Sequence, residues 1–150
     1  MKRQRSWPIA LAGLACVALG CPTGGGSTIR GTVTMDGRPL DNAEVVFEPF
    51  DRTQSIGGDR AVTDGQGRFE IRPDRRKFGM KPGRYSVFVS KWVDKKTRQP
   101  PPPEEMEMRR QGGMLVNQVA PRYSDRDAPP VITQEVTGKN DDLKIEVKSR

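Results

Sequence analysis

The sequence contains no histidine and only two cysteines among its 150 residues. Without histidine, neither a Ser-His-Asp nor a Cys-His catalytic arrangement can form, and a catalytic zinc site loses its commonest ligand. Two cysteines are too few for a small domain held together by several disulfides. Because the usual catalytic groups and metal ligands are missing, we expect a protein that is not an enzyme and that uses no cofactor.

Apolar residues are also scarce. Hydrophobic residues make up 33% of the chain, aromatic residues make up 6%, and the mean hydropathy is −0.72. In contrast, 16 glycines and 13 prolines punctuate the sequence. Glycine and proline interrupt helices wherever they fall, so this composition disfavours a helical bundle. The length suits one domain with extensions rather than two domains.

The longest apolar run lies near the N-terminus. Lys2, Arg3 and Arg5 precede a run of 14 residues, from Trp7 to Gly20, that is almost wholly apolar. This run is shorter than the roughly 20 residues that a transmembrane helix needs. A basic start, a short apolar stretch and small residues at its end are typical of a secretory signal. We therefore expect an exported protein.

The run ends Ala18-Leu19-Gly20-Cys21, which resembles a bacterial lipoprotein signal, although Leu is commonest in that family where Ala18 stands here. The resemblance implies that residues 1–20 are a signal peptide, and that Cys21 carries a diacylglycerol and often an acylated amine. Two or more acyl chains hold a protein stably on a bilayer. Residues 21–27, rich in Gly, would form a flexible tether. There are two alternatives to lipidation of Cys21. The leader could be an ordinary secretory signal with Cys21 incidental, or Cys16 could be the lipidated residue.

From residue 28 onward, short segments with alternating apolar side chains predict β-strands. Ile29, Gly31, Val33 and Met35 alternate with Thr and Arg, and Asp36-Gly37 follows as a tight-turn signal. We expect Phe88 and Trp92 on the face of their strand opposite to the alternating Tyr and Val residues. The predicted strands are 28–35, 43–49, 60–63, 69–71, 85–89, 131–136 and 143–147. Such a series of short strands with turns between them predicts an all-β sandwich over residues 28–150.

Residues 94–121 interrupt this rhythm as a Pro-rich insertion. Pro100-Pro101-Pro102-Pro103 favours an extended polyproline II spacer, and Glu104 to Arg110 could form two helical turns at most. A long segment without regular structure inside a small domain is unusual, and it is often functional or disordered. We expect the insertion to be disordered or loosely packed.

Several of these motifs together resemble carboxypeptidase regulatory-like domains. The segment from Gly31 to Phe47 is similar to the first two strands of that family and their Asp-Gly hairpin. Residues 63–69, Thr-Asp-Gly-Gln-Gly-Arg-Phe, look like its Thr-Asp-x-x-Gly-x-Phe turn, and 82–85 look like its Pro-Gly-x-Tyr strand start. The resemblance implies a transthyretin-like (prealbumin-like) seven-strand Greek-key sandwich.

The C-terminal part resembles small lipoproteins of planctomycete-type bacteria. In those proteins a Pro-x-Lys-Tyr segment precedes the final two strands, and Pro121-Arg122-Tyr123 is similar to it, with Arg122 where Lys is usual. The resemblance covers roughly residues 28–148, apart from the insertion. It implies a lipid-anchored protein of the cell envelope, on the periplasmic face or at the cell surface.

Residues 72–84 are the most basic part of the chain, with six basic residues and one acidic residue. Such a loop attracts anionic lipid headgroups or acidic polysaccharide, whereas export argues against nucleic acid. The alternative is a solvated loop between strands. Trp92 and Phe88 could serve as a platform for sugar or cover the sheet by packing, which we favour. The candidate contacts for an anionic ligand are Arg72, Arg75, Arg76, Lys77, Lys81 and Arg84.

Other chemistry finds less support in the sequence. Asp51, Asp59 and Asp64 do not have the spacing of a calcium-binding loop, so we expect solvated turn carboxylates there. We therefore expect a non-catalytic, lipid-anchored structural or interaction module, with envelope proteins or polysaccharide as partners besides the membrane. A binding module for carbohydrate or an anionic envelope polymer is the first alternative. A carboxylate-based enzyme is the second.

Overall fold

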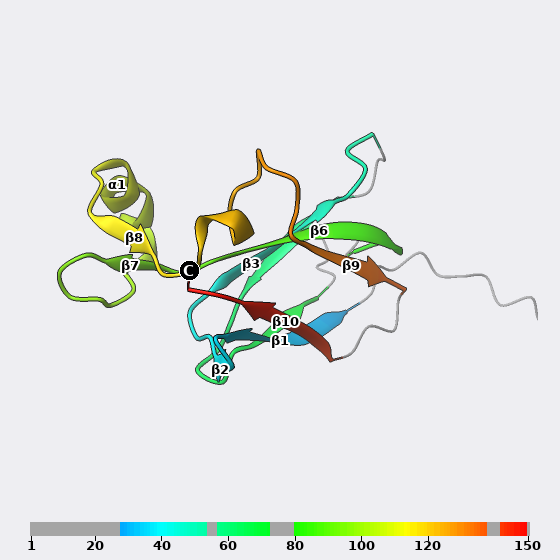
Figure 1. Ribbon diagram of the computed structural model, residues 1–150, viewed down its shortest axis with the longest axis horizontal. Helices are drawn as coiled ribbons and strands as arrows, with labels where there is room; N and C mark the ends of the chain where they lie inside the picture. The colour runs from blue at the N-terminus through cyan, green and yellow to red at the C-terminus, as the bar shows by residue number, and fades with distance from the viewer. Residues whose placement is uncertain (1–27, 54–56, 73–79, 138–141, 150) are drawn as a thin grey trace, which may run out of the picture.

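A computed structural model describes residues 28–53, 57–72, 80–137 and 142–149 of the chain (Figure 1). The strands are β1 (Ile29–Met35), β2 (Arg38–Pro39), β3 (Glu44–Pro49), β4 (Asp59–Val62), β5 (Arg68–Ile71), β6 (Gly83–Ser90), β7 (Trp92–Asp94), β8 (Leu115–Asn117), β9 (Ile132–Val136) and β10 (Leu143–Val147). The helical elements are η1 (Pro103–Glu105), α1 (Met106–Gln111) and η2 (Pro121–Tyr123). This mostly β content confirms the predicted all-β class. Among the described residues, no helix has the length and apolar character needed to cross a bilayer.

The first sheet is built around β1. Strand β10 lies parallel to it along one edge, with Val33 opposite Ile145. Strands β2 and β5 both pair antiparallel with the other edge, and Met35 lies opposite Arg38 at the β2 end. The alternation predicted for β1 is confirmed, because Val33 is fully buried whereas Arg30 is exposed.

The second sheet has the order β4-β3-β6-β9, and all its neighbouring strands are antiparallel. Val46 of β3 lies opposite both Arg60 of β4 and Phe88 of β6. Residues directly opposite each other share one face of a sheet, so these three side chains lie together on the outer face. Val45 and Val89, on the other face, are fully buried.

The two sheets enclose one hydrophobic core (Figure 1). Phe47 of β3 is at its centre, with ring centroids 5.9 Å from Phe69 of β5 and 6.5 Å from Tyr85 of β6. Burying each side chain of this kind stabilises the fold by about 1.5–3 kcal/mol. The alternating apolar positions of the predicted strands supply most of this core, which is why the strands could be located from the sequence.

The Asp36-Gly37 turn joins β1 to β2 as predicted. Its two residues have φ values of 51° and 80°, the positive values that a two-residue type I′ hairpin requires. Gly67 also has a positive φ, of 73°, and a Cβ atom there would lie 2.5 Å from the Val33 carbonyl oxygen. Glycine is therefore required at this point for both conformation and space.

The predicted disorder of the 94–121 insertion was wrong. Strands β7 and β8 pair as a hairpin, with Val93 opposite Val116, and η1 and α1 lie in the connection between them. Val93, Leu115 and Pro101 are buried. The prediction failed because it treated the prolines as a spacer and overlooked the apolar side chains in the flanking strands. Figure 1 shows the hairpin and α1 at one end of the molecule, beyond the two sheets. We call residues 92–117 the arm.

Candidate functional site

Three of the basic residues predicted to contact an anionic ligand are described, and their contacts are separate. Arg72 forms an ion pair with Glu70, with Nη2 2.6 Å from Oε2. The Arg84 guanidinium lies 4.2 Å from the centre of the Phe50 ring. Lys81 is exposed and its carbonyl accepts a hydrogen bond. The other predicted site residues lie outside the described part of the chain: Cys21, Arg75, Arg76 and Lys77.

Tyr85 and Asp64 have structural roles, Tyr85 at the start of β6 and Asp64 in the turn before β5. The fully buried Tyr85 donates its hydroxyl to the Lys81 carbonyl at 2.8 Å, and burial raises the pKa of this tyrosine. The Asp64 carboxylate accepts the amides of Gln66 and Arg68 at 2.8 and 2.9 Å. These two hydrogen bonds, with Arg68 as the larger cause, hold the pKa of Asp64 below its usual value.

The aspartates considered for calcium bind nearby groups of the protein. Asp59 accepts the amide of Arg60 at 2.8 Å, and Asp51 accepts both the amide and the hydroxyl of Thr53. Within the described ranges, no three acidic or cysteine residues come together as metal ligands would. These carboxylates thus accept hydrogen bonds from neighbouring residues, as turn carboxylates do.

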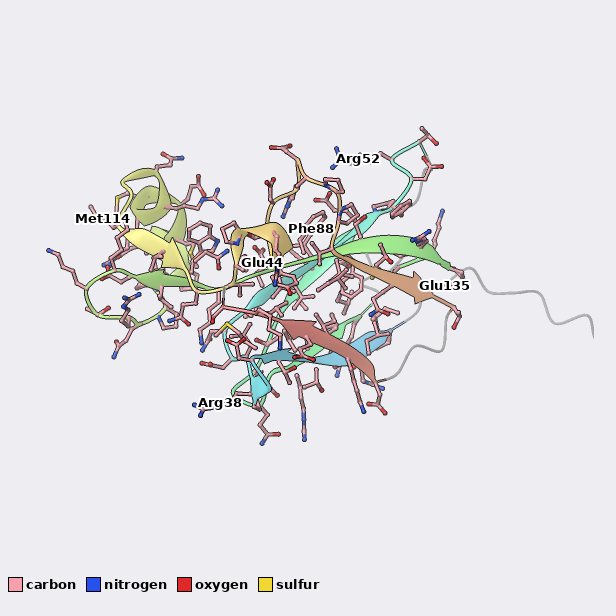
Figure 2. All side chains as sticks on the ribbon, viewed as in Figure 1. Arg38, Glu44, Arg52, Phe88, Met114 and Glu135 are labelled. Carbon is pink, nitrogen blue, oxygen red and sulfur yellow. The ribbon has the colours of Figure 1, made fainter. Side chains whose placement is uncertain are left out.

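The outer face of the second sheet has a hollow in its surface. Its floor is formed by Val46 and Phe88, which are only 9% and 5% exposed although they lie outside the main core. Trp92, at the start of the arm, forms part of its wall. The hollow has a volume of about 460 Å³. Figure 2 shows Phe88 and Glu44 on this sheet, with Arg38 on the other sheet.

A second hollow, of about 620 Å³, continues from the first. The two share Glu44, Arg60 and Trp92, so they are parts of one open depression. The arm and the edge strand β4 line the second part, whose surface is mostly apolar. We call the whole the Trp92 cleft; it is lined by Asn42, Glu44, Val46, Arg60, Ala61, Val62, Phe88, Val89, Ser90, Trp92, Pro100, Pro101, Pro103, Met106, Arg110, Ser124 and Arg126.

The Trp92 cleft brings together three arginines from different parts of the chain. Arg60 is on β4, Arg110 on α1, and Arg126 in the segment after η2. Each arginine also has an acidic neighbour on the surface: Nη1 of Arg60 is 3.3 Å from Glu44, Nη2 of Arg110 is 2.8 Å from Glu107, and Nη1 of Arg126 is 3.0 Å from Glu48. The arginine side chains are at least half exposed in all three pairs, so these ion pairs contribute little to stability.

Asn117 fixes the arm to the second sheet. Its side-chain oxygen accepts the amide of Lys91 at 2.9 Å and that of Val119 at 3.1 Å. Its side-chain nitrogen donates to the hydroxyl of Ser124 at 3.0 Å. The Lys91 ammonium also donates to the Asp41 carboxylate at 2.7 Å, and this bond is the main cause of the lowered pKa of Asp41. These contacts hold Trp92, which follows Lys91, in a defined place in the cleft wall.

Inside the arm, Asp94 and Arg109 tie the turn after β7 to α1. The Asp94 carboxylate accepts the amides of Lys96 and Thr97 and lies 3.0 Å from Nη1 of Arg109. Nε of Arg109 in turn lies 2.6 Å from Glu105. The amides of Thr97 and Lys96, followed by Arg109, hold the pKa of Asp94 below its usual value.

Sequence reasoning considered Trp92 and Phe88 as a platform for sugar but favoured packing, and it missed the arginines around them. Arg60 and Arg126 are 66 positions apart in the sequence, and the segments that hold the three arginines share no motif. Only the folding of the insertion brings Arg110 to the sheet. The lining of the cleft contains a single carboxylate, that of Glu44, beside hydroxyl, guanidinium and aromatic groups, which is chemistry suited to binding.

Comparison of the chain with known protein families, curated proteins and solved structures finds no match.

Proposed function

We propose that the protein is a non-catalytic interaction module of the cell envelope, anchored to a membrane by lipid on Cys21. The Trp92 cleft is the observation that carries the interaction role. It is an open, built depression whose walls come from the sheet, the arm and the segment after η2. A surface of this kind, held in place by the contacts of Asn117, suits a bound partner better than it suits a purely mechanical spacer.

The anchor is supported by the leader sequence. Basic residues, a short apolar run and a small residue before Cys21 resemble a lipoprotein signal, and a Gly-rich tether follows at once. Lipidation would place the interaction module beside a bilayer. The proposed compartment is the cell envelope, which agrees with a mature chain that has a single cysteine and so needs no internal disulfide.

For the fold, we propose the transthyretin-like Greek-key sandwich of carboxypeptidase regulatory-like domains. The I′ hairpin at Asp36-Gly37, the glycine turn at Gly67 and the buried Tyr85 after Pro82-Gly83 support this assignment. Each of them lies where that family has the corresponding motif.

A carboxylate-based hydrolase is a weaker candidate for this site. Paired-carboxylate hydrolysis uses two acidic side chains that flank one scissile bond, about 5–10 Å apart. Glu44 is the single acidic residue in the lining of the cleft, and its carboxylate is engaged by Arg60 at 3.3 Å, so the lining supplies no such pair.

Cell fractionation of point variants tests the anchor. The wild-type chain, expressed in a bacterium that processes lipoproteins, should be recovered with the membranes. Cys21→Ser should move it to the soluble fraction, whereas Cys16→Ser, the matched control, should leave it on the membranes. Membrane recovery of Cys21→Ser equal to that of the wild type would contradict the proposal.

A further inference from the structure

We propose that the Trp92 cleft binds an acidic polysaccharide, with sugar carboxylates on its arginines and sugar rings against its aromatic wall. This inference rests on the proposed interaction role and names its ligand class. It also moves the expected binding surface from the basic loop at 72–84, whose described residues have separate contacts, to the outer face of the second sheet.

The arginines of the cleft offer hydrogen-bond donors to an anionic ligand. Three arginines and one glutamate line the cleft, and Glu107 and Glu48 pair with Arg110 and Arg126 beside it. A guanidinium has five N–H donors in a planar fork that matches a carboxylate, and the ion pair of each arginine involves one of its nitrogens. The side chains of Arg60, Arg110 and Arg126 are 72%, 51% and 51% exposed, so their remaining donors face solvent. A ligand carboxylate can use these donors without breaking the existing pairs.

The uncharged part of the cleft favours sugar rings. Trp92 offers a partly exposed aromatic side chain above the nearly buried Phe88 and Val46, and Ser90 and Ser124 supply hydroxyl groups. A sugar ring has an apolar face and a polar edge, and therefore it can meet both kinds of surface at once. An aromatic group with hydrogen-bonding groups around it provides that combination.

The shape of the cleft favours a chain over a small molecule. Its two hollows join at Trp92, Glu44 and Arg60 and are open to solvent along the arm and the edge strand β4. A small molecule is usually enclosed by its site, whereas a polymer needs an open depression through which it can enter and leave. Several weak contacts along one chain then add up to useful affinity.

The direct test is calorimetric titration of the full chain with an oligogalacturonate, at low and at moderate salt. Binding should weaken as salt rises, because exposed charges are screened. The double variant Arg110→Gln/Arg126→Gln should lower the association constant by about tenfold or more, since it removes two of the three guanidinium groups that would bind the sugar carboxylates. Arg38→Gln removes the same charge from an exposed site on the other sheet and should leave binding unchanged.

Two further ligands separate the parts of the inference. The methyl ester of the same oligogalacturonate, which has the rings without the charge, should bind much more weakly. Poly-L-glutamate, which has carboxylates without the rings, should also bind more weakly. The Trp92→Phe substitution should weaken the binding of oligogalacturonate and leave that of poly-L-glutamate unchanged. Equal binding of poly-L-glutamate, an equal effect of Arg38→Gln, or no binding of oligogalacturonate would each overturn the inference.

The variants also distinguish this inference from the proposed function on which it rests. Thermal unfolding of Arg110→Gln/Arg126→Gln and Trp92→Phe should match that of the wild type, which shows that any loss of binding is local. Fractionation of Cys21→Ser reports the anchor alone. Failure of the wild-type chain to bind oligogalacturonate, with an intact anchor, would reject the polysaccharide ligand and leave the tethered module standing.

Discussion

At the scale of single residues, the buried side chain of Thr63 joins the segment after β4 to the segment before β3 by two hydrogen bonds. It is 3% exposed, its hydroxyl accepts the amide of Ala43 at 2.9 Å, and it donates to the carbonyl of Leu40 at 2.6 Å. A buried backbone group left without a partner costs about 1–3 kcal/mol. One hydroxyl therefore satisfies two backbone groups at the entrance to β3.

Replacing Thr63 with valine should destabilise the protein by about 1–3 kcal/mol, because valine has the same shape but leaves both backbone groups unpaired. Urea unfolding followed by circular dichroism measures the change in free energy of unfolding. Thr133→Val, at a half-buried position on β9, is the matched control and should change stability much less. An equal effect of the two substitutions would contradict the role given to Thr63.

Asp94 should make the arm sensitive to acid. Its folded-state pKa lies below the usual 3.8, so its contribution to stability is present above that value and is lost as the pH falls through the folded-state pKa. An NMR titration of the Lys96 and Thr97 amides should show a midpoint below 3.8, and the arm should loosen over the same pH range. In Asp94→Asn this acid-dependent step should disappear. A midpoint at or above 3.8 would show that the carboxylate does not hold the turn.

At the scale of elements, β6 and β7 are nearly continuous, and Lys91 is the one residue between them. The arm thus continues from the end of β6, an inner strand of the second sheet. Three contacts of the Asn117 side chain and the backbone bond from Gln118 to the Lys91 carbonyl, at 2.9 Å, hold it at this junction. The position of Trp92 depends on these few bonds.

Asn117→Ala should release the arm while the sandwich stays folded. We expect faster hydrogen exchange of the β7 and β8 amides, equivalent to a local loss of about 1–3 kcal/mol, and unchanged exchange in β1 and β6. Gln118→Ala is the matched control, because the contact of Gln118 with Lys91 uses its backbone N–H and survives the substitution. Equal exchange in the two variants would mean that the Asn117 side chain does not hold the arm.

The strands could be predicted from the sequence because their cause is local. Alternating apolar residues and turn pairs such as Asp36-Gly37 act over a few residues, and both were read correctly. The turn that contains Asp64 and the strand that begins before Tyr85 have the same local origin. The local pattern did not show that β10 pairs with β1, since that contact joins segments more than 100 residues apart.

The arm and the cleft could not be predicted, because their causes are long-range. Asn117 acts on Lys91 across 26 positions, and Arg109 acts on Asp94 across 15. Neither pair belongs to a periodic pattern, and the four prolines between them indicated a spacer. In the sequence the arginines of the cleft are scattered, so they indicated no site. The anionic-ligand site was predicted at the basic loop 72–84 because its charges are adjacent in the sequence.

At the scale of the whole molecule, the proposed protein combines an anchor with a binding face. If Cys21 carries the lipid, only six residues, 22–27, separate it from the first described residue of the sandwich. So short a connection would place the sandwich beside the membrane. The Trp92 cleft can then meet a polymer in the layer next to the bilayer, where a weak single-site affinity is helped by the high local concentration of both partners.

The anchor is the central claim, because it sets the compartment in which every other part of the account operates. The most direct measurement is the mass of the N-terminal peptide from protein purified out of membranes. We predict a mature chain that begins at Cys21 and carries the added mass of a diacylglycerol, with or without a further acyl chain. A mature N-terminus at any other residue, or an unmodified Cys21, would contradict the account.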